Sequence, residues 1–457
     1  MRKLVVFILG LCAFSVVSYA QLDTLRYRLS LTDKLASAYD MDRPEEFLSQ
    51  KAIERRYKQG LPIDESDLPV CQVYIDQIRE LGAKVVAKGK WDNFVTVSFN
   101  DPVVLDKLSR LPFVRGVELV WTASQADKKV HTPQRDSLVN QMEWFENYYG
   151  VGKEQIEISQ ADKLHQEGYK GEGVVIAVID AGFHNADLID GMNNISIMGT
   201  RDFVSDASDI YAENSHGMAV LSCIAMNKPH HMVGTAPYAS FWLLRSEDDK
   251  SEHLIEEDYW AAAVEFADSV GVDIISTSLG YHEFDDVSKN YKYSDLDGKT
   301  ALMSRQASRI AAKGMILVCS AGNSGMGSWK KTTTPGDADP IITVGAVSKQ
   351  GILAPFSSIG NTADNRIKPD VVAVGLGSDV MGTDGCLTKA NGTSFSTPIM
   401  SGMVACLWQA CPDLTAVEVI ELVRSVGDRA NNPDNIYGYG IPNIWEAYLK
   451  VKGIKKE

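Results

Sequence analysis

The chain has 457 residues, of which 45% are hydrophobic and 23% charged. These values exclude extensive disorder, and the length predicts two or three folded units. The formal net charge of −15 excludes nucleic acid as the expected partner, because a phosphate backbone needs a basic surface. The cysteine spacings form no zinc pattern and HExxH is absent, so no metal-ligating motif is expected.

The first twenty residues have the pattern of a targeting segment. A positively charged start is followed by an apolar run over 4–17 and by the small-x-small ending Ser18-Tyr19-Ala20. We predict that 1–20 is a signal peptide and that the protein is exported, either secreted or periplasmic. A lipid anchor at Cys12 is the weaker alternative, because Leu11 before it is bulky. No later apolar run reaches eighteen residues, so no membrane anchor is expected after cleavage.

Export permits disulfides, and six cysteines remain after residue 20. Cys223 and Cys319 lie in apolar runs and are predicted to be small core residues. A disulfide among Cys386, Cys406 and Cys411 stays open, because pairing does not follow from spacing.

Residues 21–145 are predicted to form a small α+β unit with an insertion. Their elements follow the order βαββαβ, with an additional charged helix that is expected to be exposed, and this order is the split βαβ, ferredoxin-like arrangement. The polar stretch 122–145 is interpreted as an exposed connector. The expected strands are 27–31, 83–89, 93–99 and 113–120, and the expected helices are 44–58, 72–81 and 102–111.

From about residue 150, strands and helices alternate, which predicts a doubly wound α/β sheet of mainly parallel strands. Several of the strands are uninterrupted apolar runs, as in sheets buried on both faces. Catalytic groups in such folds lie at the carboxyl ends of strands or at the starts of the following helices. The expected strands are 173–180, 239–246, 272–280, 315–323 and 342–348, and the expected helices are 215–226, 254–270, 300–313 and 396–411.

Four polar residues fall at these positions. Asp180 and Asn323 end buried strands, whereas His216 and Ser394 open helices. Each could be an ordinary turn or cap residue, but together they provide the groups for acyl transfer in the chain order Asp, His, Ser. That is the order of subtilisin, not of the α/β-hydrolases. The hydrolase pattern G-x-S-x-G also fails, because Ser396 stands at its second glycine.

Five motifs in sequence order resemble those of the subtilisin-like serine proteases, the subtilases. The resemblance covers about 165–447 and implies a subtilisin-like, mainly parallel sheet flanked by helices. The unit before it resembles the inhibitory propeptide of secreted members, which predicts a signal peptide at 1–20, a propeptide at 21–145 and a peptidase domain at 146–457. The motifs are VIDAGFHNADL (178–188), NSHGMAVLS (214–222), STSLG (276–280), CSAGNSG (319–325) and GTSFSTPIMSG (392–402).

The resemblance implies a role for each matching residue. Ser394 is the expected nucleophile, His216 its base, Asp180 the acid that orients the base, and Asn323 an oxyanion donor. An extended substrate is expected to pair with the strand of the STSLG motif, and the asparagine motif is expected to form a wall of the P1 pocket. The expected substrate-binding residues are Ser278, Leu279, Gly280, Ala321 and Gly322.

The chain departs from the family pattern at three places that keep every catalytic group. Ala181 follows the aspartate where threonine or serine is usual. Met218 replaces a common threonine. Phe395-Ser396-Thr397 stands where Met-Ala-x is usual. These departures leave open an enzyme of low turnover.

The acidic run 247–258 follows a strand near the expected non-prime subsites. It is either a solvated loop with a helix start, or the source of a preference for Lys or Arg at P2 or P4. Calcium is common in the family, and Asp295, Asp297 and Gly298 begin like a calcium loop. A helix cap explains them equally well. No cofactor is expected to be required, and a structural calcium stays open.

The function predicted is an exported serine endopeptidase that is made as a self-processing zymogen. Its expected partners are protein or peptide substrates and its own propeptide, which acts as an intramolecular inhibitor. We expect a monomer. The alternative is a non-catalytic binding or scaffold protein on the same fold.

Overall fold

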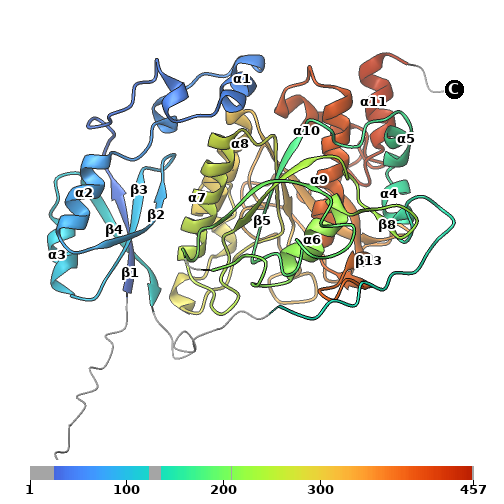
Figure 1. Ribbon diagram of the computed structural model, residues 1–457. Coiled ribbons are helices and arrows are strands. Elements are labelled where there is room, and N and C mark those ends of the chain that lie inside the picture. The colour runs from blue at the N-terminus through green and yellow to red at the C-terminus, as the bar shows by residue number, and fades with distance from the viewer. Residues whose placement is uncertain (1–24, 123–134, 207, 455–457) are drawn as a thin grey trace, which may run out of the picture.

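A computed structural model describes residues 25–122, 135–206 and 208–454 (Figure 1). The predicted signal peptide lies outside these ranges, as do residues 123–134 of the predicted connector. Two units follow one another along the chain, a small unit (25–122) and a large unit (146–454), and each has its own sheet. Within the described ranges, no helix is both long and apolar enough to cross a membrane.

The small unit has a four-stranded sheet in the order β2-β3-β1-β4, and every neighbouring pair is antiparallel. Two helices cover one face, and their buried residues Ile75 and Leu108 pack with Leu29 and Val97 of the strands. This is the predicted split βαβ arrangement. The elements are β1 (Leu25–Leu31), α2 (Gln72–Glu80), β2 (Lys84–Gly89), β3 (Phe94–Phe99), α3 (Val103–Ser109) and β4 (Val114–Thr122).

The prediction of one exposed helix over 44–58 is wrong in two respects. A 3-10 turn, η1 (Pro44–Glu46), comes first, and helix α1 (Gln50–Lys58) begins after Ser49, whose hydroxyl accepts the Ala52 N–H at 3.3 Å. Arg55 and Arg56 of α1 are only 7% and 1% exposed. Their charges predicted exposure to solvent, but both arginines form ion pairs with the buried carboxylate of Asp268, which is distant in the sequence. A second turn, η2 (Glu65–Asp67), completes the insertion.

The large unit has an eight-stranded sheet in the order β14-β13-β12-β11-β10-β5-β9-β6. All neighbours are parallel except the antiparallel pair β13 and β14, so the predicted mainly parallel sheet is confirmed. From β5 the chain passes to the edge strand β6, then forms β9 between β5 and β6, and later crosses to β10 on the other side of β5. The strand order therefore reverses beside β5, and a crevice at the carboxyl ends of the strands is expected there.

The strands of this sheet are β5 (Val175–Asp180), β6 (Ser196–Asp202), β9 (Ser240–Arg245), β10 (Ile274–Thr277), β11 (Ile316–Ser320), β12 (Ile342–Ser348), β13 (Val371–Met381) and β14 (Leu387–Asn391). A separate hairpin is formed by β7 (Asn227–Lys228) and β8 (Met232–Val233).

Helices cover both faces of the sheet (Figure 1). Val178 of β5 belongs to a core with α6 and α9, whereas its neighbour Ile179 belongs to a core with α7 and α8. Because successive strand residues point to opposite faces, burial on both sides explains the uninterrupted apolar runs. The helices are α4 (Lys153–Glu157), α5 (Ala161–Gln166), α6 (His216–Ala225), α7 (Ile255–Val270), α8 (Leu302–Ile310), α9 (Thr393–Ala410), α10 (Ala416–Ser425) and α11 (Ile444–Lys452), with 3-10 turns η3 (Val287–Lys289), η4 (Tyr293–Asp295) and η5 (Ala311–Lys313).

The small unit packs beside α7 of the large unit (Figure 1). The Glu265 carboxylate accepts the backbone N–H groups of Lys90 at 2.5 Å and Trp91 at 2.9 Å. Arg28 on β1 pairs with Asp258, which is fully buried. Thr96 of β3 also donates to Asp258, at 2.6 Å, so the face of the small sheet opposite α2 and α3 lies on α7.

Residues 135–145 of the predicted connector lie along the large unit. The N–H groups of Val139 and Asn140 both donate to the carbonyl of Asp384, and Phe145 N–H donates to the carbonyl of His230. Most side chains of this stretch are exposed, as predicted, but its backbone is bound.

The six cysteines in the described residues are unpaired, so none of the disulfides left open by the sequence forms among Cys386, Cys406 and Cys411. Cys223 and Cys319 are fully buried within the cores, as predicted.

Candidate active site

Asp180 and His216 meet at the carboxyl end of the central strand. Asp180 is the last residue of β5 and fully buried, and His216 is the first residue of α6. The Nδ1 atom of His216 lies 2.8 Å from Oδ1 of Asp180, which also accepts the Ala181 N–H at 2.8 Å. Because a carboxylate only accepts, Nδ1 carries the hydrogen and Nε2 is left to take up a proton.

Gly217 allows this close approach of α6 to β5. A Cβ atom at this position would lie 2.4 Å from the Gly182 carbonyl oxygen and 2.8 Å from the Cβ of Asp180. Any larger residue would push His216 away from its carboxylate. The glycine that follows the histidine is therefore required by packing at the site.

The surroundings of His216 increase its proton affinity. About a third of the side chain is exposed, at 34%. Burial of the rest would lower its pKa, but the Asp180 carboxylate, with a smaller contribution from Glu247, outweighs burial and raises the pKa to about 9. The imidazole is thus a stronger base than a free histidine.

Ser394 is the second residue of α9 and is 8% exposed. Its neighbour Phe395 has its ring 5.9 Å from the His216 ring, which brings the serine and histidine segments together. Its hydroxyl lies 3.5 Å from the Ser278 carbonyl oxygen, a length at which a hydrogen bond is weak. Its backbone N–H has no partner among the described residues, as expected in the first turn of a helix.

A proline inside α9 explains a second link between Ser278 and Ser394. Pro398 has no N–H, so the Ser394 carbonyl four residues earlier lacks its usual helical partner. The Ser278 hydroxyl donates to that carbonyl at 2.9 Å instead. The residue after β10 therefore completes the first turn of the helix that carries Ser394.

Asn323 follows β11 and is exposed. Its Oδ1 atom accepts both the backbone N–H of Thr393, at 2.9 Å, and the Thr393 hydroxyl, at 3.1 Å. Since a backbone N–H only donates, the atom facing it is the amide oxygen, and the NH2 group is free of partners among the residues described. Asn323 therefore binds the residue that precedes Ser394, so its amide NH2 group and the Ser394 N–H lie close together in space.

The predicted substrate-binding segments converge on Thr333. A Cβ atom on Gly280 would lie 2.3 Å from the Thr333 hydroxyl oxygen, and one on Gly322 would lie 3.1 Å from it. Gly280 is exposed, and its backbone finds no hydrogen-bond partner in the described parts of the chain. Ala321 is fully buried and donates its N–H to the Val344 carbonyl, so it can only form the wall of such a site.

Ser278 and Leu279 are also nearly buried, at 8% and 4% exposed. Together with Gly280 they form the extended stretch after β10, and an added strand can reach them chiefly through backbone groups.

Two of the three unusual residues after Ser394 form hydrogen bonds within the first turn of α9. The hydroxyls of Ser396 and Thr397 both donate to the carbonyl of Thr393, at 3.0 and 2.9 Å. Phe395 is 7% exposed and lies against His216, and Met218 is 1% exposed in the core behind it. None of these residues displaces a polar group of the site.

The sequence matches two family models. A model described as "Subtilase family" matches residues 171–440, more than half of the chain. The chain belongs to the subtilase family. A second model, described as "Peptidase S8 propeptide domain, Bacteroidota", matches residues 26–136 of this subtilase, which contain the small unit.

Curated relatives agree with this assignment. The subtilase is 27% identical over 375 residues to subtilisin NAT from Bacillus subtilis subsp. natto, covering 81% of this chain and 85% of the relative. It is 28% identical over 295 residues to subtilisin DY from Bacillus licheniformis, covering 64% and 97%. It is 29% identical over 319 residues to serine protease AprX from Bacillus subtilis, covering 63% and 69%. The protein is a serine endopeptidase of this family, whose members need no organic cofactor.

The interpretation of 247–258 as solvated is wrong for most of its acidic residues. Glu247 and Glu252 are half-buried, and Glu256 is 1% exposed. One oxygen from each of the three carboxylates lies within 4.8 Å of the others, and together they could hold a cation. Burial and mutual repulsion raise the pKa of Glu256 well above its usual value, so without a counter-charge this cluster retains protons.

The carboxylates of the predicted calcium loop accept hydrogen bonds from backbone N–H groups within the same loop. Asp297 accepts the N–H groups of Lys299 and Thr300, at 2.8 and 2.7 Å, and Asp295 accepts the N–H of Lys292 at 2.8 Å. Asp295 thus closes η4 and Asp297 closes a turn, whereas α8 begins after Ala301 without a side-chain cap, so the alternative of a cap before α8 is wrong. A structural calcium in this subtilase stays a prediction.

Two residues of the site were missed by sequence reasoning. Arg245, 3% exposed at the end of β9, donates to the Ala181 carbonyl at 2.9 Å and to Asp202 at 2.9 Å, and so holds the loop after Asp180. Glu247 lies close enough to act on His216. Arg245 is the last residue of β9 and Glu247 follows this strand, so both obey the rule that located the other groups at the carboxyl ends of strands.

Proposed function

We propose that this subtilase is an exported, self-processing endopeptidase whose catalytic residues are Asp180, His216 and Ser394, with Asn323 as an oxyanion donor. The observation that carries the proposal is the 2.8 Å hydrogen bond between His216 and Asp180, with the first turn of α9 beside it.

In the first half of the reaction, the Ser394 hydroxyl attacks the carbonyl carbon of a peptide bond. Nε2 of His216 takes up the hydroxyl proton, while Nδ1–H remains bound to Asp180. The carbonyl oxygen becomes an oxyanion. It accepts hydrogen bonds from the Asn323 amide and from the Ser394 N–H, two donors that need no reorganisation as the charge forms.

In the second half, His216 gives its proton to the leaving amine, and the carbon–nitrogen bond breaks to leave an acyl-enzyme. A water molecule then gives a proton to His216 and attacks the ester, and His216 returns the proton to Ser394. The Asp180 carboxylate stabilises the imidazolium in both halves but does not take the proton.

Substrate is proposed to bind as an added strand along Ser278, Leu279 and Gly280. The unpaired backbone of Gly280 favours this mode, and Ala321 and Gly322 form the opposite wall of the P1 pocket. The carboxylates of Glu247 and Glu252 lie on the side of His216, which supports a preference for Lys or Arg at P2 or P4.

The domain limits proposed are a signal peptide at 1–20, a propeptide at 21–145 and a peptidase domain at 146–457. The small unit packs on α7 as an intramolecular inhibitor would, and cleavage between the two units makes the propeptide and the mature enzyme separate chains. We expect the mature enzyme to be monomeric.

The test is expression of the full chain beside Ser394→Ala. The wild type is expected to lose its N-terminal part, up to about residue 145, whereas the variant stays at full length. Identical full-length products from both chains, under conditions in which both are folded, would refute self-processing.

A further inference from the structure

The insertion in the small unit, residues 44–68, reaches a part of the large unit far from Ser394. We call this segment the arm; it contains η1, α1 and η2. The arm contacts Val272 and Gly314, which lie just before β10 and β11. These contacts are therefore at the amino ends of parallel strands whose carboxyl ends carry the candidate active site. Figure 1 shows α1 at the same end of the molecule as α10.

Arg55 of the arm closes the ends of two helical segments of the large unit. Its guanidinium donates to the carbonyl of Asp268 at 3.2 Å, in the last turn of α7, and to that of Val272, which follows this helix. It also donates to the carbonyl of Lys313 at 3.1 Å, at the end of η5. Carbonyls at a helix C-terminus lack helical partners, and a positive charge is favourable there. Arg55 thus provides donors for carbonyls at the C-terminal ends of both α7 and η5.

Gln59 makes a similar bridge with neutral groups. Its amide nitrogen donates to the Gly314 carbonyl at 2.8 Å, and its amide oxygen accepts the N–H of Ala416 at 2.9 Å. Ala416 is the first residue of α10, where N–H groups are unpaired within the helix.

A buried charge cluster fastens the arm more strongly. Asp268 of α7 is fully buried and pairs with Arg55 at 2.6 Å, with Arg56 at 3.0 Å and with Lys90 at 3.2 Å. Burial would raise the pKa of Asp268, but these three cations hold it well below its usual range. Arg56 also pairs with Asp67 at the end of the arm, at 2.7 Å. Such pairs are screened by salt much less than surface pairs.

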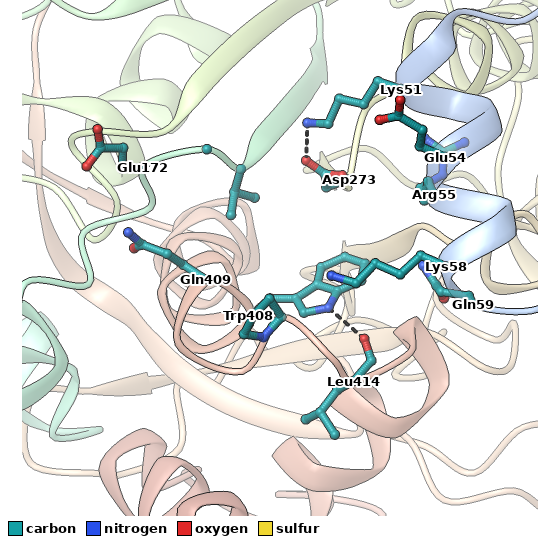
Figure 2. Close-up of a pocket in the computed structure, with 13 residues that line it drawn as sticks. Lys51, Glu54, Arg55, Lys58, Gln59, Glu172, Asp273, Trp408, Gln409 and Leu414 are labelled. Atoms are coloured by element: carbon teal, nitrogen blue, oxygen red, sulfur yellow. Dashed lines mark hydrogen bonds and ion pairs between the residues drawn. The ribbon is translucent and has the colours of Figure 1, made fainter.

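Helix α1 of the arm binds the large unit through polar groups and not through an apolar face. Ala52 is the one apolar residue that α1 buries. A cleft of about 330 Å³ remains beside the contact. Figure 2 shows Glu54 and Lys58 of α1 on one side of it and Glu172 on the other. Lys51 borders this cleft and pairs with Asp273 at 2.6 Å.

We propose that the arm is a second anchor, which keeps the cleaved propeptide bound to the peptidase domain whether or not the cleaved end of the propeptide occupies the active site. This inference rests on the proposed self-processing for its role in the cell. The contacts themselves do not depend on catalysis. The proposed binding surface on the mature enzyme consists of the C-terminal ends of α7 and η5 and the N-terminus of α10. Its partner is the arm of the enzyme's own propeptide.

The test uses the full chain with Ser394→Ala and with the recognition sequence of a site-specific protease placed within 123–134. After cleavage by that protease, dissociation of a fluorescently labelled N-terminal fragment is measured in an excess of unlabelled fragment. Arg55→Ala leaves Asp268 with two of its three cations, and truncating one member of a buried interfacial pair costs at least about 2 kcal/mol. We therefore expect dissociation to be about 30-fold faster or more.

Arg43→Ala is the matched control, because it removes a charge directly before the arm and its ion pair is with Glu46 of the arm, not with the large unit. Its dissociation rate is expected to equal that of the unmodified arm. If Arg55→Ala dissociates within about twofold of the control, the second anchor is refuted. If Arg55→Ala does not fold, Gln59→Ala decides: a rate several times the control supports the anchor, and an unchanged rate overturns it. A wild-type chain that fails to cleave itself would refute self-processing but would not alter this measurement.

Discussion

Asn323→Ala tests whether the amide of this residue stabilises the oxyanion. The substitution removes the two amide N–H donors and leaves His216, Asp180 and Ser394 in place. Loss of one oxyanion donor of this kind lowers kcat by about 10²–10³, or about 2.7–4 kcal/mol. KM is expected to change little, because the donors act on a charge that exists only in the transition state.

The same substitution removes a helix cap, because Oδ1 of Asn323 accepts the Thr393 N–H at 2.9 Å. Asn323 is exposed, so water can replace this bond, and we expect a loss of stability of about 0.5–1 kcal/mol. Asn323→Asp separates the two roles, since a carboxylate still accepts from Thr393 and suits a helix N-terminus. Both variants are expected to lose turnover, but only Asn323→Ala is expected to lose stability.

The assay must not depend on self-processing. Each variant is produced with a site-specific protease site within 123–134, cleaved, and separated from its propeptide before kcat and KM are measured on a chromogenic peptide. Active enzyme is counted by titration with a fluorophosphonate. If Asn323→Ala keeps kcat within about threefold of the wild type, the oxyanion assignment is wrong.

Three further predictions concern neighbouring groups. Charge on Glu247 raises the pKa of His216, so Glu247→Gln is expected to move the acid limb of the kcat/KM profile to lower pH; an unmoved limb would show that Glu247 does not act on His216. Ser278→Ala leaves the Ser394 carbonyl unpaired behind Pro398, and we expect unfolding measurements to show a loss of about 1–3 kcal/mol; unchanged stability would contradict this role. A peptide library is expected to show a preference for Lys or Arg at P2 or P4 that weakens in Glu247→Gln, and a library without such a preference would exclude the subsite.

The candidate site was predictable where its signals are local. Asp180 ends an uninterrupted apolar strand, and Ser394 opens a helix after a Gly-Thr pair, so both positions follow from short stretches of sequence. The edge strand β6 was not predicted, because most of its residues are polar, none is buried and its two apolar residues, Ile197 and Met198, are adjacent and do not alternate. Strand β13 was missed for another reason: two glycines, Gly375 and Gly377, interrupt its apolar run.

The remaining errors come from contacts between distant residues. Arg55 and Arg56 look like solvent-exposed residues in the sequence. In the structure both donate to the buried carboxylate of Asp268, which lies more than 200 residues away in the sequence. One of the two interpretations of the acidic run that contains Glu256 places it in solvent, although Tyr281 donates to that carboxylate at 3.0 Å from another segment. Local charge patterns give no information on such partners. Helix α10 was missed despite a local signal, since Thr415 and Glu418 form a capping box.

The most direct test of the catalytic assignment is to map the residue that a fluorophosphonate modifies in the enzyme after external cleavage and removal of the propeptide. The account predicts a single adduct, on Ser394, whose formation slows strongly in His216→Ala. Labelling of a different serine, or no labelling of a folded and separated enzyme, would contradict it.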